Sequence, residues 1–276
     1  MTLRALLLFL AIVLPARGAL ACGDPETPCP VTGGQYFVAL PQDVVSPPAL
    51  FWLHGYAASG KAFRSNPRVL EAVLSRGYGV IAPDGQPNPF QRSHLDWGVS
   101  DGVPLARDDI AFLQEVRADA IARFGIDPER VLVAGYSRGG GMAWDLACAD
   151  PSFGFAFATH AGGFWEPLPG DCAGPIRLLH SHGFTDSTLP PEGSAMTFYG
   201  QNYTVGDIFA GLALWRETMG CPLNAQTSVA SPYLWIKDWT GCAQGSLRLE
   251  LLPGGHNRRP DWPGAAIDWA DTLPHG

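Results

Sequence analysis

The chain has 276 residues, of which 46% are hydrophobic and 16% are charged, a balance typical of one globular domain with a sizeable core. Its formal net charge of −8 and its lack of a basic cluster argue against a nucleic-acid-binding protein. The 33 Gly and 25 Pro are spread along the chain, which indicates a loop-rich fold and not a disordered one.

The N-terminus has the pattern of a secretory signal peptide covering residues 1–21. A basic residue precedes an apolar block, Ala5 to Leu14, and small residues just before Cys22 form a cleavage site. The alternative is a lipoprotein anchored through Cys22. No later run approaches the roughly 20 apolar residues that a membrane span needs. We therefore expect export to the periplasm or the cell exterior, with residues 22–276 forming a single domain.

All six cysteines follow the predicted signal, and an even count in an exported chain indicates three disulfides. Sequence proximity alone favours pairing between neighbours, although a buried free thiol is the alternative for any one of them. The cysteines and histidines do not cluster at zinc-binding spacing. The expected pairs are Cys22–Cys29, Cys148–Cys172 and Cys221–Cys242.

Short apolar runs alternate with segments of helical periodicity along the rest of the chain. The segment 66–77 carries helix boundaries at both ends, because Asn66 can cap it, Pro67 suits its first position and Gly77 stops it. In chain order we expect strand 35–40, strand 49–55, helix 66–77, strand 78–85, helix 105–125, strand 130–135, helix 139–150, strands 153–163 and 176–183, helix 205–220, strand 247–255 and helix 264–273.

This alternation predicts an α/β fold, with a mostly parallel sheet covered by helices on both faces. The run at 49–55 is apolar throughout, which favours a central strand. Functional sites in such sheets lie beyond the carboxyl ends of the strands. The loops that follow strands are therefore where chemistry is expected.

The sequence Gly-Tyr-Ser-Arg-Gly at 135–139 lies between an expected strand and an expected helix. It matches G-x-S-x-G, in which a sharp turn exposes the serine hydroxyl above the sheet and glycines relieve the crowding. The start of the following helix also favours developing negative charge. We therefore expect Ser137 to be a nucleophile; the alternative is a serine that caps an ordinary tight turn.

A nucleophilic serine needs a base, and the base needs an orienting acid. His256 follows the last expected strand in a Gly-rich loop, and Asp186 follows the strand 176–183. Their chain order after the serine, acid and then histidine, is the order known for this turn. Three other carboxylates lie in the same interval, and they fit less well: Asp171 precedes its strand, Asp207 resembles a helix cap, and Asp238 lies in a predicted insertion.

Acyl transfer also needs two donors for the oxyanion. One is expected to be the backbone N–H of Arg138, directly after the nucleophile. The other is expected from the early loop 53–60, with the backbone N–H of Tyr56 as donor. His54 and Gly55 let that loop turn tightly, so we interpret them as structural.

Four segments in this order, LHGYAASG, GYSRGGGMAW, HSHGFTDSTLP and GGH, resemble the secreted α/β-hydrolase esterases of the polyhydroxybutyrate depolymerase and feruloyl esterase family. The likeness spans 35–268. It implies an α/β-hydrolase fold, export, and Ser137, Asp186 and His256 as a catalytic triad. The segments CGDPETPC, GCPLN and WTGC also resemble disulfide segments of that family. The chain departs from the family in a glycine-poorer oxyanion loop, and in NRRPD between the histidine and Trp262.

These features predict a secreted serine esterase that needs no metal or organic cofactor. The leading substrate expectation is poly(3-hydroxybutyrate) or its hydroxyacid oligomers. Feruloyl or acetyl esters of plant polysaccharide are the alternative, and a prolyl-type peptidase comes third. From another class, the chain could be an inactive secreted binding protein on the same fold.

Nine Trp are present, and several fall in expected rim loops. Aromatic faces there could bind a polyester or a phenolic acyl group. Core packing is the equal alternative for each of them. The candidates for substrate contact are Trp97, Trp165 and Trp262.

Overall fold

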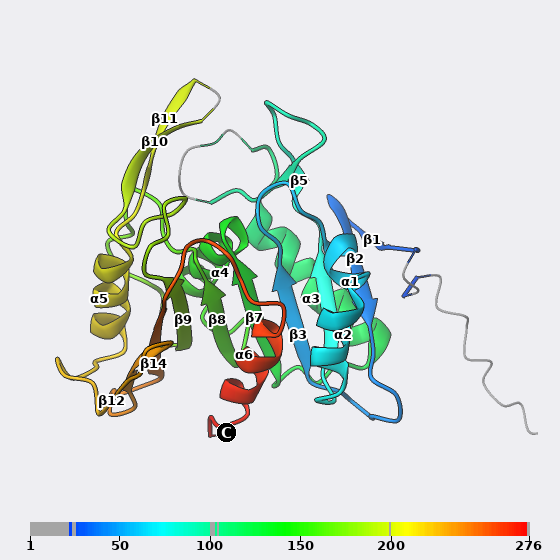
Figure 1. Cartoon of the computed structure of the whole chain (residues 1–276). Coiled ribbons are helices and arrows are strands. Elements are labelled where there is room, and N and C mark those ends of the chain that lie inside the picture. The colour runs from blue at the N-terminus through cyan, green and yellow to red at the C-terminus, as the bar shows by residue number, and fades with distance from the viewer. Residues whose placement is uncertain (1–21, 24–25, 100–102, 104, 199, 275–276) are drawn as a thin grey trace, which may run out of the picture.

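The computed structural model describes residues 22–23, 26–99, 103, 105–198 and 200–274, so the predicted signal segment lies outside the described residues. A ten-stranded sheet runs through the middle of the molecule (Figure 1). In spatial order its strands are β1 (Cys29–Val31), β2 (Gly34–Ala39), β4 (Gly79–Pro83), β3 (Ala49–Leu53), β7 (Val131–Tyr136), β8 (Ala156–His160), β9 (Arg177–Gly183), β14 (Ser246–Leu252), β13 (Trp235–Trp239) and β12 (Thr227–Ala230).

The middle of the sheet is parallel and its two edges are antiparallel. Every pairing from β4 through β3, β7, β8 and β9 to β14 is parallel. The pairs β1–β2, β2–β4, β12–β13 and β13–β14 are antiparallel. The carboxyl ends of the parallel strands therefore meet at one edge, which is the upper edge in Figure 1.

Helices cover both faces of the sheet, as the sequence predicted. On one face lie α3 (Asp109–Phe124), α4 (Arg138–Ala149) and α5 (Ile208–Thr218); on the other lie α1 (Gly60–Arg64), α2 (Pro67–Leu74) and α6 (Trp262–Ala270). Side chains alternate along each strand, so Phe51 and Leu53 join the first layer while Leu50 and Trp52 join the second.

Local capping explains where the helices begin. The side chain of Asn66 accepts hydrogen bonds from the first N–H groups of α2, and Pro67 occupies the first helical position. Asp108 caps α3 in the same way by accepting from Ala111 N, so this helix begins later than the expected residue 105. Its end is set by Gly125, which has a φ of 67° in the left-handed region.

Several strands were not predicted. Two short hairpins stand above the sheet: β5 (Gln86–Pro87) with β6 (Leu95–Asp96), and β10 (Ser194–Phe198) with β11 (Gln201–Val205). The edge strands β12 and β13 were also missed. They have only 4 and 5 residues, and β12 is exposed throughout. Asp238 consequently lies in β13, bound to Arg248 at 2.6 Å, and not in an insertion.

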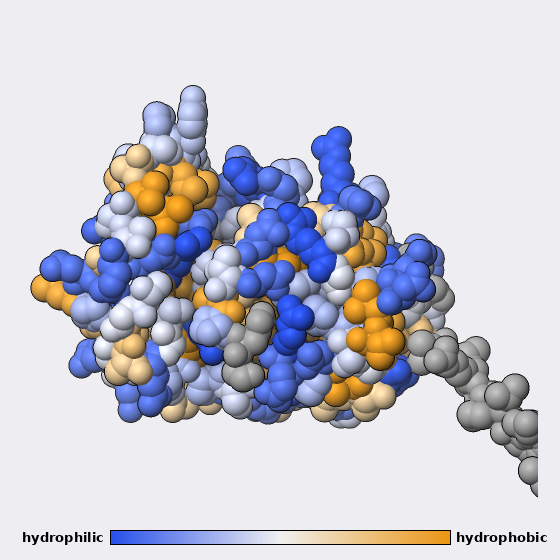
Figure 2. All heavy atoms as spheres, turned by 90° about the horizontal axis from the view of Figure 1, so that it is seen from below, coloured by the Kyte–Doolittle hydropathy of each residue, from blue (hydrophilic) through white to orange (hydrophobic). Residues whose placement is uncertain are grey.

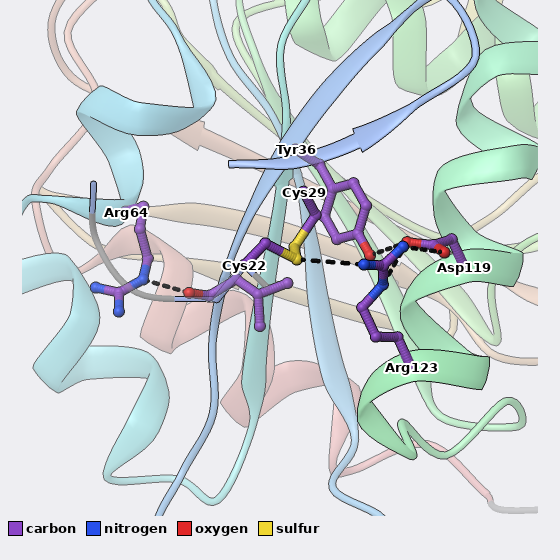
Figure 3. The surroundings of a disulfide bond; sticks show 7 residues. Cys22, Cys29, Tyr36, Arg64, Asp119 and Arg123 are labelled. Atoms are coloured by element: carbon purple, nitrogen blue, oxygen red, sulfur yellow. Dashed lines mark hydrogen bonds and ion pairs between the residues drawn. A yellow bond between two sulfur atoms is a disulfide. The ribbon is translucent and has the colours of Figure 1, made fainter. Parts of the chain in front are cut away.

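The six cysteines form the disulfides Cys22–Cys29, Cys148–Cys172 and Cys221–Cys242, which is the pairing of sequence neighbours. Figure 3 shows the first of them packed between β2 and α3. Arg123 approaches Cys22 Sγ at 3.7 Å and also pairs with Asp119, which accepts the Tyr36 hydroxyl. The first described residues are thereby fastened to the body of the fold.

The end of the molecule opposite the carboxyl ends of the strands is shown in Figure 2. Hydrophobic residues form separate patches there between hydrophilic ones. Among the described helices, none combines the length and the apolar character needed to cross a membrane.

Candidate active site

Ser137 occupies a strained turn between β7 and α4. Its φ of 55° and ψ of −122° are rare for a residue with a side chain. The flanking glycines are required by close approach: a Cβ on Gly135 would lie 2.1 Å from Gly139 O, and a Cβ on Gly139 would lie 2.1 Å from Leu53 O. The turn therefore needs glycine on both sides of the serine, as the sequence pattern indicated.

The structure brings together the three side chains that the sequence singled out. His256 Nε2 lies 2.8 Å from Ser137 Oγ, and His256 Nδ1 lies 2.7 Å from Asp186 Oδ2. The Asp186 side chain is fully buried, whereas 18% of the His256 side chain is exposed. The histidine can therefore exchange protons with an incoming molecule, while the carboxylate is shielded from water.

Asp186 is surrounded by donors. Its Oδ1 accepts the backbone N–H groups of Thr188 and Leu189 at 2.8 and 2.9 Å. Burial alone would raise the pKa of Asp186, but hydrogen bonds from His182, His256 and Leu189 N lower it well below its usual range. The carboxylate is therefore charged at any pH at which the protein would work.

The other carboxylates of the interval lie elsewhere. Asp207 caps α5 by accepting from two backbone N–H groups, which is the helix-start role that the sequence indicated. Asp171 is exposed in the loop before β9, and Asp238 is paired in β13. Neither contacts His256 in the described hydrogen-bond network.

Tyr136, directly before the serine, connects the nucleophile turn to the histidine loop. Its hydroxyl donates to the carbonyl oxygen of His256 at 2.6 Å, and the two rings lie 5.2 Å apart. The same ring packs near the Arg258 guanidinium, at 5.8 Å. The position of His256 is therefore held by the residue next to Ser137.

Replacing Tyr136 with phenylalanine should lower kcat about fivefold, because it removes one hydrogen bond worth about 1 kcal/mol from the His256 loop. The ring contact stays, so substrate affinity should change little. Steady-state kinetics of Tyr136→Phe on a small ester would measure this. A kcat equal to that of the wild type would show that the loop is held by other contacts.

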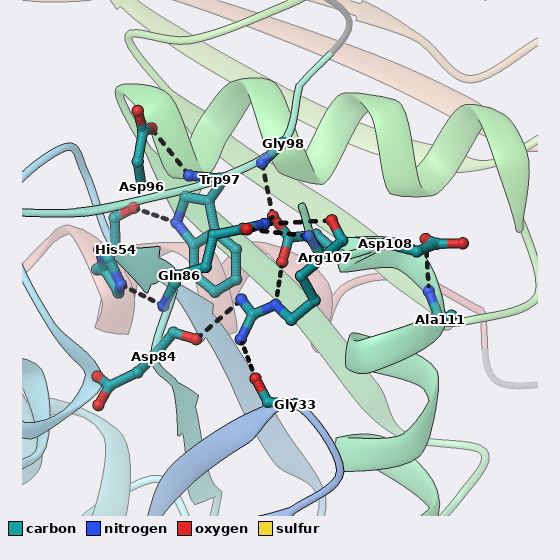
Figure 4. A network of polar contacts seen from close by, with 12 residues as sticks. Gly33, His54, Asp84, Gln86, Asp96, Trp97, Gly98, Arg107, Asp108 and Ala111 are labelled. Atoms are coloured by element: carbon teal, nitrogen blue, oxygen red, sulfur yellow. Dashed lines mark hydrogen bonds and ion pairs between the residues drawn. The ribbon is translucent and has the colours of Figure 1, made fainter. Parts of the chain in front are cut away.

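The loop after β3 is held by a buried polar network (Figure 4). His54 Nδ1 donates to Gly55 O at 2.8 Å, and His54 Nε2 accepts from Gly85 N at 2.9 Å. Trp97 Nε1 donates to His54 O at 2.8 Å. Arg107 donates to the carbonyl oxygens of Asp84 and Gly33, at 3.2 and 3.1 Å. His54 is thus structural, as expected, and the network fixes the backbone that leads into Tyr56.

A cavity of about 150 Å³ opens beside Ser137. Its walls come from the two loops expected to supply oxyanion donors, from the loop after Asp186 and from the β10–β11 hairpin. They are mostly apolar and aromatic, with one ion pair. The lining residues are Tyr56, Asp96, Val103, Ser137, Arg138, Trp165, Thr188, Leu189, Met196, Phe198 and Tyr203.

The ion pair joins the residue after the nucleophile to strand β6. Arg138 Nε lies 2.7 Å from Asp96 Oδ1, and both side chains are almost fully buried. Arg138 also donates to Trp97 O at 3.0 Å, and its guanidinium lies 5.0 Å from the Trp165 ring. These contacts hold the start of α4 in place, and Arg138 is the first residue of that helix.

Of the three tryptophans expected at the substrate, only Trp165 lines this cavity. Trp97 is completely buried in the network of Figure 4. Trp262 packs against Trp52 with ring centres 6.2 Å apart and donates to Ser181 Oγ at 2.9 Å. Trp97 and Trp262 are therefore core residues, which corrects the expectation: a tryptophan near a loop gains more from burial than from exposure.

A larger cavity, of about 680 Å³, lies between α5 and strands β12–β14. Its walls include Phe209, Leu212, Trp235 and Trp239. The described residues that line it include no histidine or carboxylate, so the chemistry described above belongs to the smaller cavity.

No family model matches the sequence. Feruloyl esterase B of Piromyces equi is 27% identical over 184 residues, which covers 63% of this chain and 33% of that protein. Probable feruloyl esterase C of Aspergillus oryzae is 28% identical over 183 residues, 66% of this chain and 57% of that protein. Feruloyl esterase C of Emericella nidulans is 33% identical over 139 residues, which covers 48% of this chain and 46% of that protein. The chain thus spans less than two thirds of the length of these curated relatives.

Solved structures match over most of the chain. The acetyl xylan esterase from Aspergillus awamori superposes with a TM-score of 0.65 at 16% identity, covering 88% of this chain and 95% of that one. The Bacillus cereus carboxylesterase superposes with a TM-score of 0.58 at 14% identity, covering 87% of this chain and 95% of that one. The fold is that of the α/β hydrolases. At such identities the similarity establishes the fold alone.

Sequence reasoning missed the residues that the β10–β11 hairpin contributes to the cavity. Met196 and Phe198 come from its first strand and Tyr203 from its second. Their alternation with polar residues on either side of Gly200 is a hairpin signal that would have found them. The hairpin forms one wall of the small cavity.

Proposed function

We propose that this protein is a serine hydrolase of carboxylic esters. The observation that carries the proposal is the hydrogen-bonded series from Ser137 Oγ through His256 to Asp186, at 2.8 and 2.7 Å. An intact series of this kind also speaks against the alternative of an inactive binding protein. Since the pKa of Asp186 is held low by its donors, the carboxylate is available to stabilise a protonated His256.

The reaction follows from these positions. His256 Nε2 takes the Ser137 proton as Oγ attacks the ester carbonyl carbon, and the carbonyl oxygen becomes an oxyanion. The backbone N–H groups of Tyr56 and Arg138 are proposed to bind it, since both residues line the cavity with Ser137. As the ester C–O bond breaks, His256 returns the proton to the leaving alcohol. Water, deprotonated by His256, then releases the acid and restores Ser137.

The proposed substrates are feruloyl or acetyl esters of plant polysaccharide. Aromatic side chains line the cavity, and faces such as those of Tyr56, Trp165 and Phe198 suit a phenolic acyl group. The curated relatives carry feruloyl esterase names, and one similar structure is an acetyl xylan esterase. These similarities favour plant-polysaccharide esters over poly(3-hydroxybutyrate).

We further propose export, with residues 22–276 acting as one catalytic domain. Three disulfides are described, and disulfides persist in oxidising compartments. The predicted signal peptide at 1–21 points in the same direction.

The experiment is acid release from methyl ferulate, acetylated xylan and amorphous poly(3-hydroxybutyrate), run side by side with Ser137→Ala as the blank. We expect release of ferulate or acetate at a higher kcat/KM than of hydroxybutyrate. Release of hydroxybutyrate alone would overturn the substrate proposal and leave the mechanism intact. Activity that is unchanged in the Ser137→Ala blank would overturn the mechanism.

A further inference from the structure

A chain of buried polar side chains leads from the core of the sheet to Asp186. Its members are Trp144 on α4, Thr159 on β8, and His180 and His182 on β9. Thr159 and His180 are register partners, and His180 and His182 share one face of β9 because side chains alternate along a strand. The links are Trp144 Nε1 to Thr159 Oγ1 at 3.0 Å, Thr159 Oγ1 to His180 Nδ1 at 3.0 Å, and His180 Nε2 to His182 Nδ1 at 3.1 Å.

The chain ends on the loop that holds the carboxylate. His182 Nε2 lies 2.8 Å from Leu189 O and 3.4 Å from Asp186 Oδ2. Leu189 N in turn donates to Asp186 Oδ1 at 2.9 Å. His182, Leu189 and Asp186 therefore form a closed ring of contacts, and Leu189 is also part of the cavity wall.

Chemistry fixes the direction of every proton in this chain. A carbonyl oxygen only accepts, so His182 Nε2 carries a proton, and in the neutral ring Nδ1 accepts from His180 Nε2–H. His180 Nδ1 must then accept the Thr159 hydroxyl proton. Thr159 Oγ1 accepts from Trp144, whose indole N–H can only donate. All donors therefore point from the core toward Asp186.

The surroundings keep His180 neutral. His180 and His182 are fully buried. Burial, reinforced by the neighbouring imidazoles of His182 and His160, holds the pKa of His180 well below its ordinary value. The titratable groups around His182 are thus His180 on its own strand, His160 on β8, and Asp186 in the following loop. Of these, Asp186 is the group that carries charge.

We propose that His182 is a positioning residue for Asp186. Its Nε2–H, shared between Leu189 O and Asp186 Oδ2, holds the same carboxylate oxygen that faces His256 Nδ1. The chain from Trp144 fixes the His182 ring in the tautomer that can do this. The inference rests on the proposed function, because only a catalytic Asp186 gives the positioning a consequence in rate.

Two variants test separately the contacts made by the two ring nitrogens of His182. His182→Asn places an amide near Nδ1, so it retains a partner for His180 but cannot reach Asp186. His182→Gln places an amide near Nε2 and can donate to Asp186. We expect kcat on a small ester to fall about 10- to 100-fold in His182→Asn, with a smaller change in KM, and to stay within about threefold of the wild type in His182→Gln.

Ser181→Ala is the matched control. Ser181 is buried on the same strand, and its side chain contacts His160 and Trp262 on the other side of the sheet. It also donates to the backbone carbonyl of Thr159 at 3.2 Å, but it does not contact the Thr159 hydroxyl or the His182 ring. It should lose stability with kcat within about twofold of the wild type. Equal losses in His182→Asn and His182→Gln, a wild-type kcat in His182→Asn, or an equal loss in Ser181→Ala would each overturn the proposal.

A second measurement needs neither a variant nor an active enzyme. Nitrogen NMR of histidine-labelled wild-type protein should find His182 neutral with its proton on Nε2. A proton on Nδ1 alone would leave no donor facing Asp186 and would overturn the proposal. A wild type that hydrolyses no ester would instead count against the proposed function, and the NMR result would still decide the position of the His182 proton.

Discussion

Replacing Ser137 with alanine is expected to lower kcat for ester substrates by about 10⁶-fold, because the nucleophile and its base act as one unit. The backbone of the turn is set by Gly135 and Gly139, so Ser137→Ala should fold as the wild type does. Steady-state kinetics with a small chromogenic ester would measure the loss.

His256→Ala should lose a comparable factor, and the double variant should lose little more than either single one. This non-additivity distinguishes a hydrogen-bonded series from two independent contributions. Multiplicative losses, or a Ser137→Ala enzyme with a tenth of wild-type activity, would contradict the assignment.

Mild acid is expected to destabilise the protein steeply, because His54, His160 and His180 are buried in the neutral form. Burial is the largest cause for each; it lowers the pKa of His54 and His180 and brings that of His160 from an ordinary 6.5 to about 3. In the unfolded chain these side chains titrate near 6.5. Below that pH the unfolded state binds more protons than the folded state, so the free energy of unfolding falls as pH falls.

A histidine that stays neutral in the folded protein should cost about 1 kcal/mol between pH 6 and pH 5. For His160 and His180, whose pKa values lie far below the ordinary value, the two costs together should be about 2 kcal/mol. Asp186 adds nothing to this slope, because its pKa is lowered and it stays ionised in both states over that range. Urea unfolding at pH 7, 6 and 5 would measure the free energy of unfolding.

His160→Asn is the matched control for this slope. The amide can take the place of Nδ1 against Ser181 Oγ, which lies 2.8 Å away, but it does not titrate. The variant should lose the share of the pH dependence that belongs to His160. An unfolding free energy that is flat from pH 7 to pH 5 in the wild type would show that the buried histidines take up protons without cost.

The local sequence predicted the central strands, the helices on both faces and the three residues of the site, since these depend on short-range patterns. A buried parallel strand such as β7 is a continuous apolar run, and G-x-S-x-G between a strand and a helix is typical of a nucleophile turn. Asp186 and His256 followed from chain order after strands. Their meeting at 2.7 Å needs only the parallel sheet that the same pattern predicted.

The cavity wall and the polar network that supports the site could not be predicted from local sequence. The alternation around Gly200 indicates a hairpin, but it does not show that Met196 and Tyr203 lie beside Ser137. Trp97 could be assigned only once its indole N–H was seen to donate to His54 O, a contact across 43 positions. The contacts of His182 with Leu189 and Asp186 likewise depend on how the chain turns after β9, which the local sequence does not show.

Covalent trapping by a fluorophosphonate, followed by intact-mass and peptide mass spectrometry, tests directly whether Ser137 is the nucleophile. We expect one adduct, on the peptide that contains Ser137, with no adduct in Ser137→Ala and a strongly slowed reaction in His256→Ala. A wild-type protein that gains no adduct, or gains it at a residue other than Ser137, would contradict the claim that Ser137 is a nucleophile activated by His256.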